Sequence, residues 1–182
     1  MSHSNTRRML GYWEGRRGQG PCPQRSSIDP AEFADIVTQT FVLGRERAGA
    51  YPFRLAGALI EDLHRGPLGG FDFVGLWAAT DRPRVQAGLE AALARRQSLI
   101  ATAHGRSITG AEARLEMLLA PLAGRQGQVD RLLGLYQPVS PLFRLGDQTI
   151  ERLFLDDLAF ADGSGAALAP LRLAALDGRR IA

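Results

Sequence analysis

Lysine is missing from this sequence, and cysteine and histidine are scarce. All 22 basic residues are arginine, the chain has 3 histidines, and Cys22 is its single cysteine. The lack of lysine excludes Schiff-base chemistry and a phosphate-loop lysine. One cysteine excludes an internal disulfide and a cysteine-cluster metal site. The sequence also has neither a nucleophile elbow nor a His-Glu-x-x-His helix, so we expect no enzyme activity and no metal site.

Long apolar runs are missing as well. The longest uninterrupted run covers residues 117–123, far below the ~20 residues that a membrane-spanning helix needs. The amino terminus has no apolar signal segment, so we expect a cytoplasmic protein that makes no contact with a membrane. With 182 residues and an apolar fraction of 45%, the chain suits one domain with extensions.

The excess positive charge lies in the first 30 residues. The formal net charge is +3, and outside residues 1–30 the arginines and acidic residues balance. Residues 6–16 predict a short amphipathic helix with Met9, Leu10 and Trp13 on one side and arginines on the other. We expect the apolar side to dock on the body of the protein or to mediate dimerisation. The arginines leave a second hypothesis open, in which this arm contacts nucleic acid.

Further along, the chain alternates between strand and helix patterns. Asp29 and Pro30 predict the start of a helix over Pro30–Val37. The helical pattern with the clearest repeat covers residues 81–96. The other predicted elements are strands at Phe41–Arg45 and Tyr51–Ala56, a short helix at Ala58–Leu63, and strands at Leu99–Arg106, Ala111–Leu122 and Val129–Val139. Alternation in the last three strands indicates an antiparallel meander with one packed face and one wet face.

This order of elements, and four short motifs, resemble the family of bacterial single-domain PAS proteins. The motifs are Tyr12-Trp13, Arg16-Arg17, Pro23, Arg25 and Ile28-Asp29-Pro30; then Arg54–Gly57, Leu63 and Leu68–Gly70; then Leu133-Gly134 and Pro138; and in the tail Leu171–Leu173 and Asp177-Gly178. The second motif departs from the family pattern, because His64-Arg65-Gly66 stands where relatives carry Phe-Gly-Arg.

The resemblance implies an α+β fold of the PAS type. We expect an antiparallel five-stranded sheet with short helices on one face, an N-terminal helical extension and a short C-terminal extension. The corresponding ranges are 1–38 for the helical extension, 39–140 for the PAS-like core, and 141–182 for a C-terminal extension that is packed on the core or partly flexible. In this family the N-terminal helix lies against the sensory fold and often mediates self-association.

Such a fold also implies a candidate site between the concave face of the sheet and the helices. The expected lining residues are Phe53, Leu55, Leu59, Trp77, Leu89, Leu93, Leu115, Met117 and Leu133. Apolar pattern cannot distinguish a ligand pocket from a filled core, so both interpretations stay open. Haem is not expected, because residues 81–96 contain no His, Cys or Tyr, and Cys22 lies far upstream of the cysteine that flavin photosensors use.

The resemblance therefore implies a sensory or regulatory module that acts in signal transduction through protein–protein interaction. We expect a homodimer, a signalling protein as a further partner, and no bound cofactor apart from an unidentified small ligand. The alternative is a nucleic-acid-associated regulator that uses the arginine-rich N-terminal arm.

Overall fold

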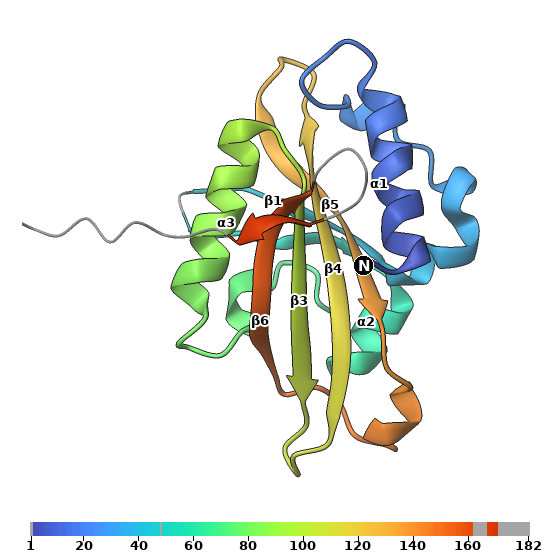
Figure 1. The fold of residues 1–182 in the computed structure, drawn as a ribbon, viewed down its shortest axis with the longest axis vertical. Coiled ribbons are helices and arrows are strands. Elements are labelled where there is room, and N and C mark those ends of the chain that lie inside the picture. Colours follow the sequence, from blue (N-terminus) through green and yellow to red (C-terminus); the bar gives the residue numbers. More distant parts are fainter. Residues whose placement is uncertain (1, 48, 162–166, 171–182) are drawn as a thin grey trace, which may run out of the picture.

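The fold is described by a computed structural model, which covers residues 2–47, 49–161 and 167–170 (Figure 1). The α-helices are α1 (Ser4–Arg17), α2 (Ala58–Leu63) and α3 (Arg82–Arg95), and the 3-10 helices are η1 (Arg25–Ser27), η2 (Pro30–Gln39), η3 (Phe73–Leu76) and η4 (Leu142–Leu145). The strands are β1 (Thr40–Gly44), β2 (Phe53–Ala56), β3 (Leu99–Arg106), β4 (Glu112–Ala123), β5 (Val129–Pro138), β6 (Arg152–Ala161) and β7 (Ala167–Pro170).

The strands form one antiparallel sheet in the order β2-β1-β5-β4-β3-β6-β7. Its first five positions are the strands that the sequence predicted. The sheet is wider than predicted, because β6 pairs along the whole of β3 and β7 pairs with β6. The C-terminal segment thus continues the sheet through residue 170. The tail motif at residues 171–178 lies outside the described residues.

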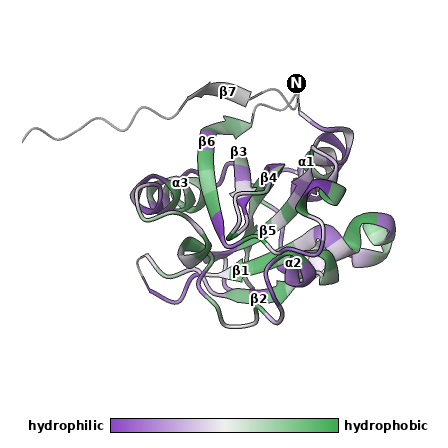
Figure 2. Cartoon of the chain, turned by 90° about the horizontal axis from the view of Figure 1, so that it is seen from below, coloured by the Kyte–Doolittle hydropathy of each residue, from purple (hydrophilic) through white to green (hydrophobic). Residues whose placement is uncertain are grey.

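Helices cover both faces of this sheet. Seen from below, the sheet is curved, with α3 on one side of it and α1 on the other (Figure 2). The inner face, under α2, η3 and α3, carries a large cluster of buried apolar residues, and the outer face, under α1 and η2, carries a second cluster. The expectation of one packed and one wet face is therefore wrong for the middle of β4, where Glu116, Leu118 and Ala120 are buried on the outer face.

The long helix α3 follows its predicted bounds, and a glycine lets it approach the sheet closely. Its buried side consists of Val85, Gly88, Leu89, Ala92 and Leu93, which follow helical spacing. A Cβ atom at Gly88 would lie 2.5 Å from a methyl carbon of Leu158 on β6. The absence of a side chain at this position lets the helix pack closely on β6 without displacing Leu158.

The segment after Asp29 begins as predicted but is not an α-helix. The Asp29 carboxylate accepts a hydrogen bond from the Ala31 amide at 3.0 Å, as an N-cap does. The chain then forms the 3-10 helix η2, which is interrupted by non-helical dihedral angles at Phe33 (φ −136°, ψ 34°). Its apolar side chains Phe33 and Ile36 are buried in the outer cluster. Within the described part of the chain, no helix combines the length and the apolar character needed to cross a membrane.

Candidate functional site

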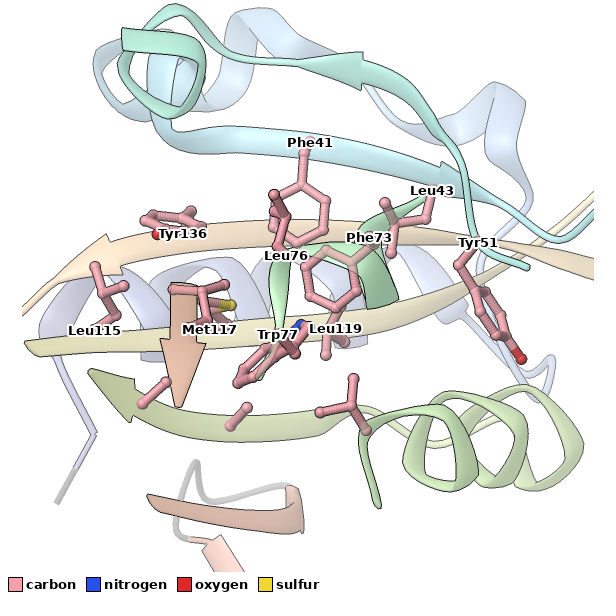
Figure 3. Packing of buried hydrophobic residues seen from close by; sticks show 14 of the residues in the cluster. Phe41, Leu43, Tyr51, Phe73, Leu76, Trp77, Leu115, Met117, Leu119 and Tyr136 are labelled. Atoms are coloured by element: carbon pink, nitrogen blue, oxygen red, sulfur yellow. The ribbon is translucent and has the colours of Figure 1, made fainter. Parts of the chain in front are cut away.

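Aromatic rings occupy the inner face of the sheet at the place where the sequence predicted a pocket or a core. The Phe73 ring lies 5.6 Å from Phe41, 5.8 Å from Phe53 and 5.8 Å from Trp77, measured between ring centroids. All four residues are at most 2% exposed. Figure 3 shows Phe41, Phe73 and Trp77 as a continuous group of rings between the sheet and the helices. Side chains pack the centre of this face as they do in a protein core.

Most of the predicted lining residues do meet on this face. Phe53, Trp77, Leu89, Leu93, Leu115 and Met117 belong to the inner cluster, and Leu59 is partly buried against it. The two exceptions are Leu55, which is 64% exposed, and Leu133, which is buried in the outer cluster. These two residues do not line the interior.

A bulge in β2 explains the misplacement of Leu55. Leu55 pairs with Val42 and Phe53 pairs with Leu43, so Arg54 is an extra residue between the two pairs. One extra residue reverses which side of the sheet the following side chain faces. For Leu133 the cause is different. It follows Leu132, and the alternation along β5 places Leu132 in the inner cluster and Leu133 in the outer one.

A buried histidine–tyrosine pair is the polar feature of the interior. The Nε2 atom of His64 lies 2.9 Å from the Tyr136 hydroxyl. Burial lowers the pKa of His64 to about 4, although a backbone hydrogen bond at Ile150 acts in the opposite direction. The imidazole is therefore neutral near pH 7, and its Nε2 atom shares a hydrogen bond with the Tyr136 hydroxyl. Burial also raises the pKa of Tyr136, which keeps the phenol protonated. The departure from the family motif at His64 thus supplies a buried polar contact.

Two buried donors of the inner cluster have no hydrogen-bond partner among the described residues, the Trp77 indole and the Tyr51 hydroxyl. The indole Nε1 of Trp77 is buried and makes no hydrogen bond with any described residue. A buried donor without a partner carries a free-energy cost of roughly 1–3 kcal/mol. An acceptor atom placed beside either donor would remove that cost.

On the outer face, α1 docks through the three residues that the sequence singled out. Met9, Leu10 and Trp13 are at most 3% exposed and contact the outer cluster. The Trp13 indole also donates a hydrogen bond of 2.7 Å to the Pro121 carbonyl on β4. The structure therefore shows α1 docked on the body of the protein, which is one of the two roles considered for this helix.

Polar contacts hold the first turn of α1 to the same face. The His3 amide donates to a Glu116 carboxylate oxygen at 2.9 Å, and the Asn5 side chain donates to the Gln137 side-chain oxygen at 2.9 Å. Glu116 and Gln137 are each 6% exposed and face each other across β4 and β5. The sequence interpretation missed Glu116 because a charged residue in an alternating strand indicates a wet face. No local signal marks it as an acceptor for a helix start.

The N-terminal arginines are engaged within the protein. Arg8 makes two hydrogen bonds, of 2.6 and 2.7 Å, with the Asp35 carboxylate, which lowers the pKa of that carboxyl group. Arg16 pairs with Glu32 and lies over the Tyr12 ring, whose hydroxyl accepts a hydrogen bond from the Asp29 amide. These contacts connect α1 to η2. Arg8 and Arg16 therefore have a structural role within the protein. This role explains their presence without contact with nucleic acid.

The remaining candidates for chemistry do not come together. Cys22 is buried in the outer cluster, and burial raises the pKa of its thiol. Among the described residues, no three His, Cys, Asp or Glu side chains are grouped so that they could hold a metal ion.

Comparison with known proteins identifies the family. The sequence profile of the PAS domain matches residues 1–137. The chain belongs to the PAS domain family. The match includes α1, so in this PAS protein the N-terminal helix lies within the matched region. Comparison with curated proteins gave no match.

Several solved structures resemble this chain at low identity and with TM-scores below 0.5. An RNA-binding light-oxygen-voltage receptor is 17% identical with a TM-score of 0.48, over 64% of this chain and 35% of that one. A light-oxygen-voltage protein of Rhodobacter sphaeroides is 16% identical with a TM-score of 0.47, over 65% and 72%. A PAS domain from Colwellia psychrerythraea is 13% identical with a TM-score of 0.45, over 60% and 95%. The PAS protein spans about a third of the receptor's chain.

Proposed function

We propose that this PAS protein is a cytoplasmic sensory module of signal transduction. A small ligand or a protein partner changes the packing of the interior, and the docking of α1 on the opposite face carries that change to a signalling partner. The module has no catalytic activity of its own. Membership of the PAS family supports the sensory role, and the geometry of two neighbouring residue pairs supports the route.

Those two pairs lie next to each other on β4 and β5 and face opposite sides of the sheet. Met117 and Tyr136 form one cross-strand pair in the inner cluster, where Tyr136 contacts His64. Glu116 and Gln137 form the next pair, on the outer face, where they bind the first turn of α1. A shift of either strand therefore moves the interior and the α1 contacts together. This is the observation that carries the proposal.

The two tryptophans allow the two faces to be observed separately. The chain contains only Trp13 and Trp77. In Trp77→Phe the remaining indole reports on α1, and in Trp13→Phe it reports on the interior. Native mass spectrometry of freshly purified protein, followed by thermal-shift screening of metabolite extracts, would identify a ligand. We expect that ligand to change the emission of both single-tryptophan variants.

A ligand that changes Trp77 emission but leaves Trp13 emission and the hydrogen exchange of α1 unchanged would contradict the proposed route. A ligand can alter the docking of α1 only as far as it binds one arrangement more tightly than the other. The size of the change in exchange therefore measures the coupling between the faces.

We further propose that the protein forms a homodimer through the apolar side of α1. Met9, Leu10 and Trp13 are buried on the protein's own sheet, so the dimer requires α1 to leave that sheet or to exchange between copies. Leu10→Arg should convert a dimer to a monomer in light scattering. Gly11→Arg adds the same charge at an exposed position with open space around it, so it should leave the mass unchanged. An unchanged mass of Leu10→Arg would count against the dimer.

A further inference from the structure

Arginine side chains gather at the end of the sheet where β4 turns into β5 and where α1 and α3 both end. Four neighbouring hollows lie there, and among the described residues eight arginines and three acidic residues line them. The arginines come from segments far apart in the sequence, including the end of α1, the end of α3 and the β4–β5 turn. The fold thus concentrates positive charge that the sequence distributes along the chain.

Three of these arginines surround the hollow between the two helix ends. Arg17 of α1 and Arg95 and Arg96 at the end of α3 line a hollow of about 430 Å³. A neighbouring hollow of about 380 Å³ shares Arg17 and Arg96 with it. Hollows of this size accommodate small organic ligands.

Aromatic rings hold two of the guanidinium groups in place, those of Arg95 and Arg17. The guanidinium of Arg95 lies 4.6 Å from the centroid of the Phe160 ring. That of Arg17 lies 6.0 Å from the Trp13 ring and 3.3 Å from a Glu14 carboxylate oxygen. Stacking on an aromatic face orients a guanidinium. It leaves the N–H donors of Arg95 free to bind, whereas Arg17 also pairs with Glu14, which lines the same hollow. Neither Arg95 nor Arg96 makes an ion pair with any residue that the structure describes.

Arg96 has a backbone conformation that favours glycine. It ends α3 with φ 55° and ψ 39°, in the left-handed region. Helices commonly end on a glycine in this conformation, and a residue with a Cβ atom is strained there. Strain of this kind is often retained where the side chain has a function. The Arg96 side chain lines three of the four hollows.

Compensation of the helix dipoles explains only part of this cluster. The carboxyl ends of α1 and α3 carry partial negative charge, which basic residues in the last turn offset. Arg16, Arg17 and Arg95 lie in those last turns. Arg96 lies beyond the last turn of α3, where a glycine would complete the helix end without strain. Its guanidinium therefore requires another explanation.

We propose that Arg17, Arg95 and Arg96 form a binding site for a phosphate-bearing small molecule between the ends of α1 and α3. Guanidinium groups bind phosphate oxygens through paired, charge-assisted hydrogen bonds, and several of them can share one dianionic group. The site does not depend on the sensory role proposed above. A bound anion would tie α1 to α3 and should slow the release of α1 from the sheet.

Titration of the full chain with inorganic pyrophosphate at constant ionic strength tests the site, with affinity measured by calorimetry. We expect saturable binding by the parent protein. Arg96→Gly should weaken the affinity about tenfold or more, because a lost charge-assisted contact costs that much. Arg95→Gln should weaken it similarly without altering the backbone. Arg65→Gly is the matched control, because Arg65 follows α2 with φ 71° and contacts Thr149, away from the site.

Arg96→Gly and Arg65→Gly each remove one positive charge and relieve the strain of a side chain at a left-handed backbone position. Both variants should therefore melt at or above the temperature of the parent. Arg65→Gly should bind pyrophosphate as the parent does. The proposal would be overturned by an equal loss of affinity in Arg65→Gly, or by a parent that binds neither pyrophosphate nor inorganic phosphate. An oligonucleotide that binds and is not displaced by pyrophosphate would overturn it in favour of a nucleic-acid surface.

Discussion

The two faces of the sheet are covered in different ways. On the inner face, aromatic and aliphatic side chains interlock, and the His64–Tyr136 contact is the polar exception. On the outer face, the cover is α1 together with η2. The apolar side of α1 is small, and the position of this helix is set by directed hydrogen bonds to Pro121, Glu116 and Gln137. Apolar packing has no direction and depends on volume, whereas hydrogen bonds depend on geometry.

This difference suits a sheet and an inner cluster that stay folded, and a helix α1 whose docking can change when a ligand or partner binds. Loss of an inner side chain leaves a cavity and affects the whole domain. Loss of one hydrogen bond at α1 affects mainly the helix that it holds, since elements with fewer apolar contacts open at lower free energy. The predictions below compare the two faces, in order of decreasing effect.

Truncation of the Phe73 ring should have the largest effect on stability. Phe73→Ala removes a fully buried ring that contacts three other aromatic residues, so we expect a loss of about 4 kcal/mol in the free energy of unfolding. Urea denaturation followed by circular dichroism measures it. The control is Phe71→Ala, since Phe71 is 47% exposed in the same loop, and it should cost less than about 1 kcal/mol. Similar losses in both variants would show that the inner face is not a close-packed core.

Acid should weaken the inner face through His64. Its pKa is about 4 in the folded protein, against about 6.5 in an unfolded chain. Between these values the unfolded chain binds a proton that the folded protein does not, so stability falls as pH falls from about 6.5 to about 4, by up to about 3 kcal/mol. His64→Gln should lose this part of the pH dependence. The Arg8–Asp35 pair on the outer side acts at lower pH, because the pKa of Asp35 is lowered. An unchanged slope in His64→Gln would contradict the assignment.

Two glycines should respond to alanine with opposite signs. A Cβ atom at Gly134 would lie 2.1 Å from a carbon of the Phe41 ring, which crosses from β1 onto β5, so Gly134→Ala should cost about 2 kcal/mol. Gly11 on α1 has nothing within 4 Å of that position, so Gly11→Ala should stabilise by about 0.5–1 kcal/mol. Thermal denaturation measures both. A stable Gly134→Ala would mean that the Phe41 ring can move away.

The last effect should be confined to the outer cover. Trp13→Phe removes the indole donor to Pro121, at a cost of about 1 kcal/mol to the docking of α1. Hydrogen exchange should then become faster in α1 by about fivefold, while amides of β3 and β4 change less. A uniform change across the sheet would show that α1 and the sheet open as one unit.

Much of the fold could be predicted from the sequence because its signals are local. The bounds of α3, β3, β4 and β5 follow from periodicity, and the buried side of α1 follows from the spacing of Met9, Leu10 and Trp13. The motif glycines have steric causes, although the residues that they meet are distant in the sequence. A Cβ atom at Gly57 would lie 2.2 Å from the Thr38 carbonyl oxygen, and Gly134 lies under the Phe41 ring. Steric needs of this kind leave a visible mark in the residue type.

The candidate site was harder to predict, because the alternation of side chains along a strand decides on which face of the sheet a residue lies. One extra residue at Arg54 turns Leu55 to the outside, and adjacent leucines at 132 and 133 give no indication of which one faces inward. Glu116 has the pattern of a surface residue, yet it is buried because α1 brings an amide donor to it.

The order of the elements, the ends of the longest ones and the apolar side of α1 can be predicted from the sequence, since each depends on residues within a few positions of one another. Three features arise only in the folded chain: β6 joins the sheet beside β3, Tyr136 contacts His64, and Arg17 and Arg96 line one hollow. Those contacts join residues 46 or more positions apart, and burial, charge and hydrogen bonding at such contacts arise only when the chain folds.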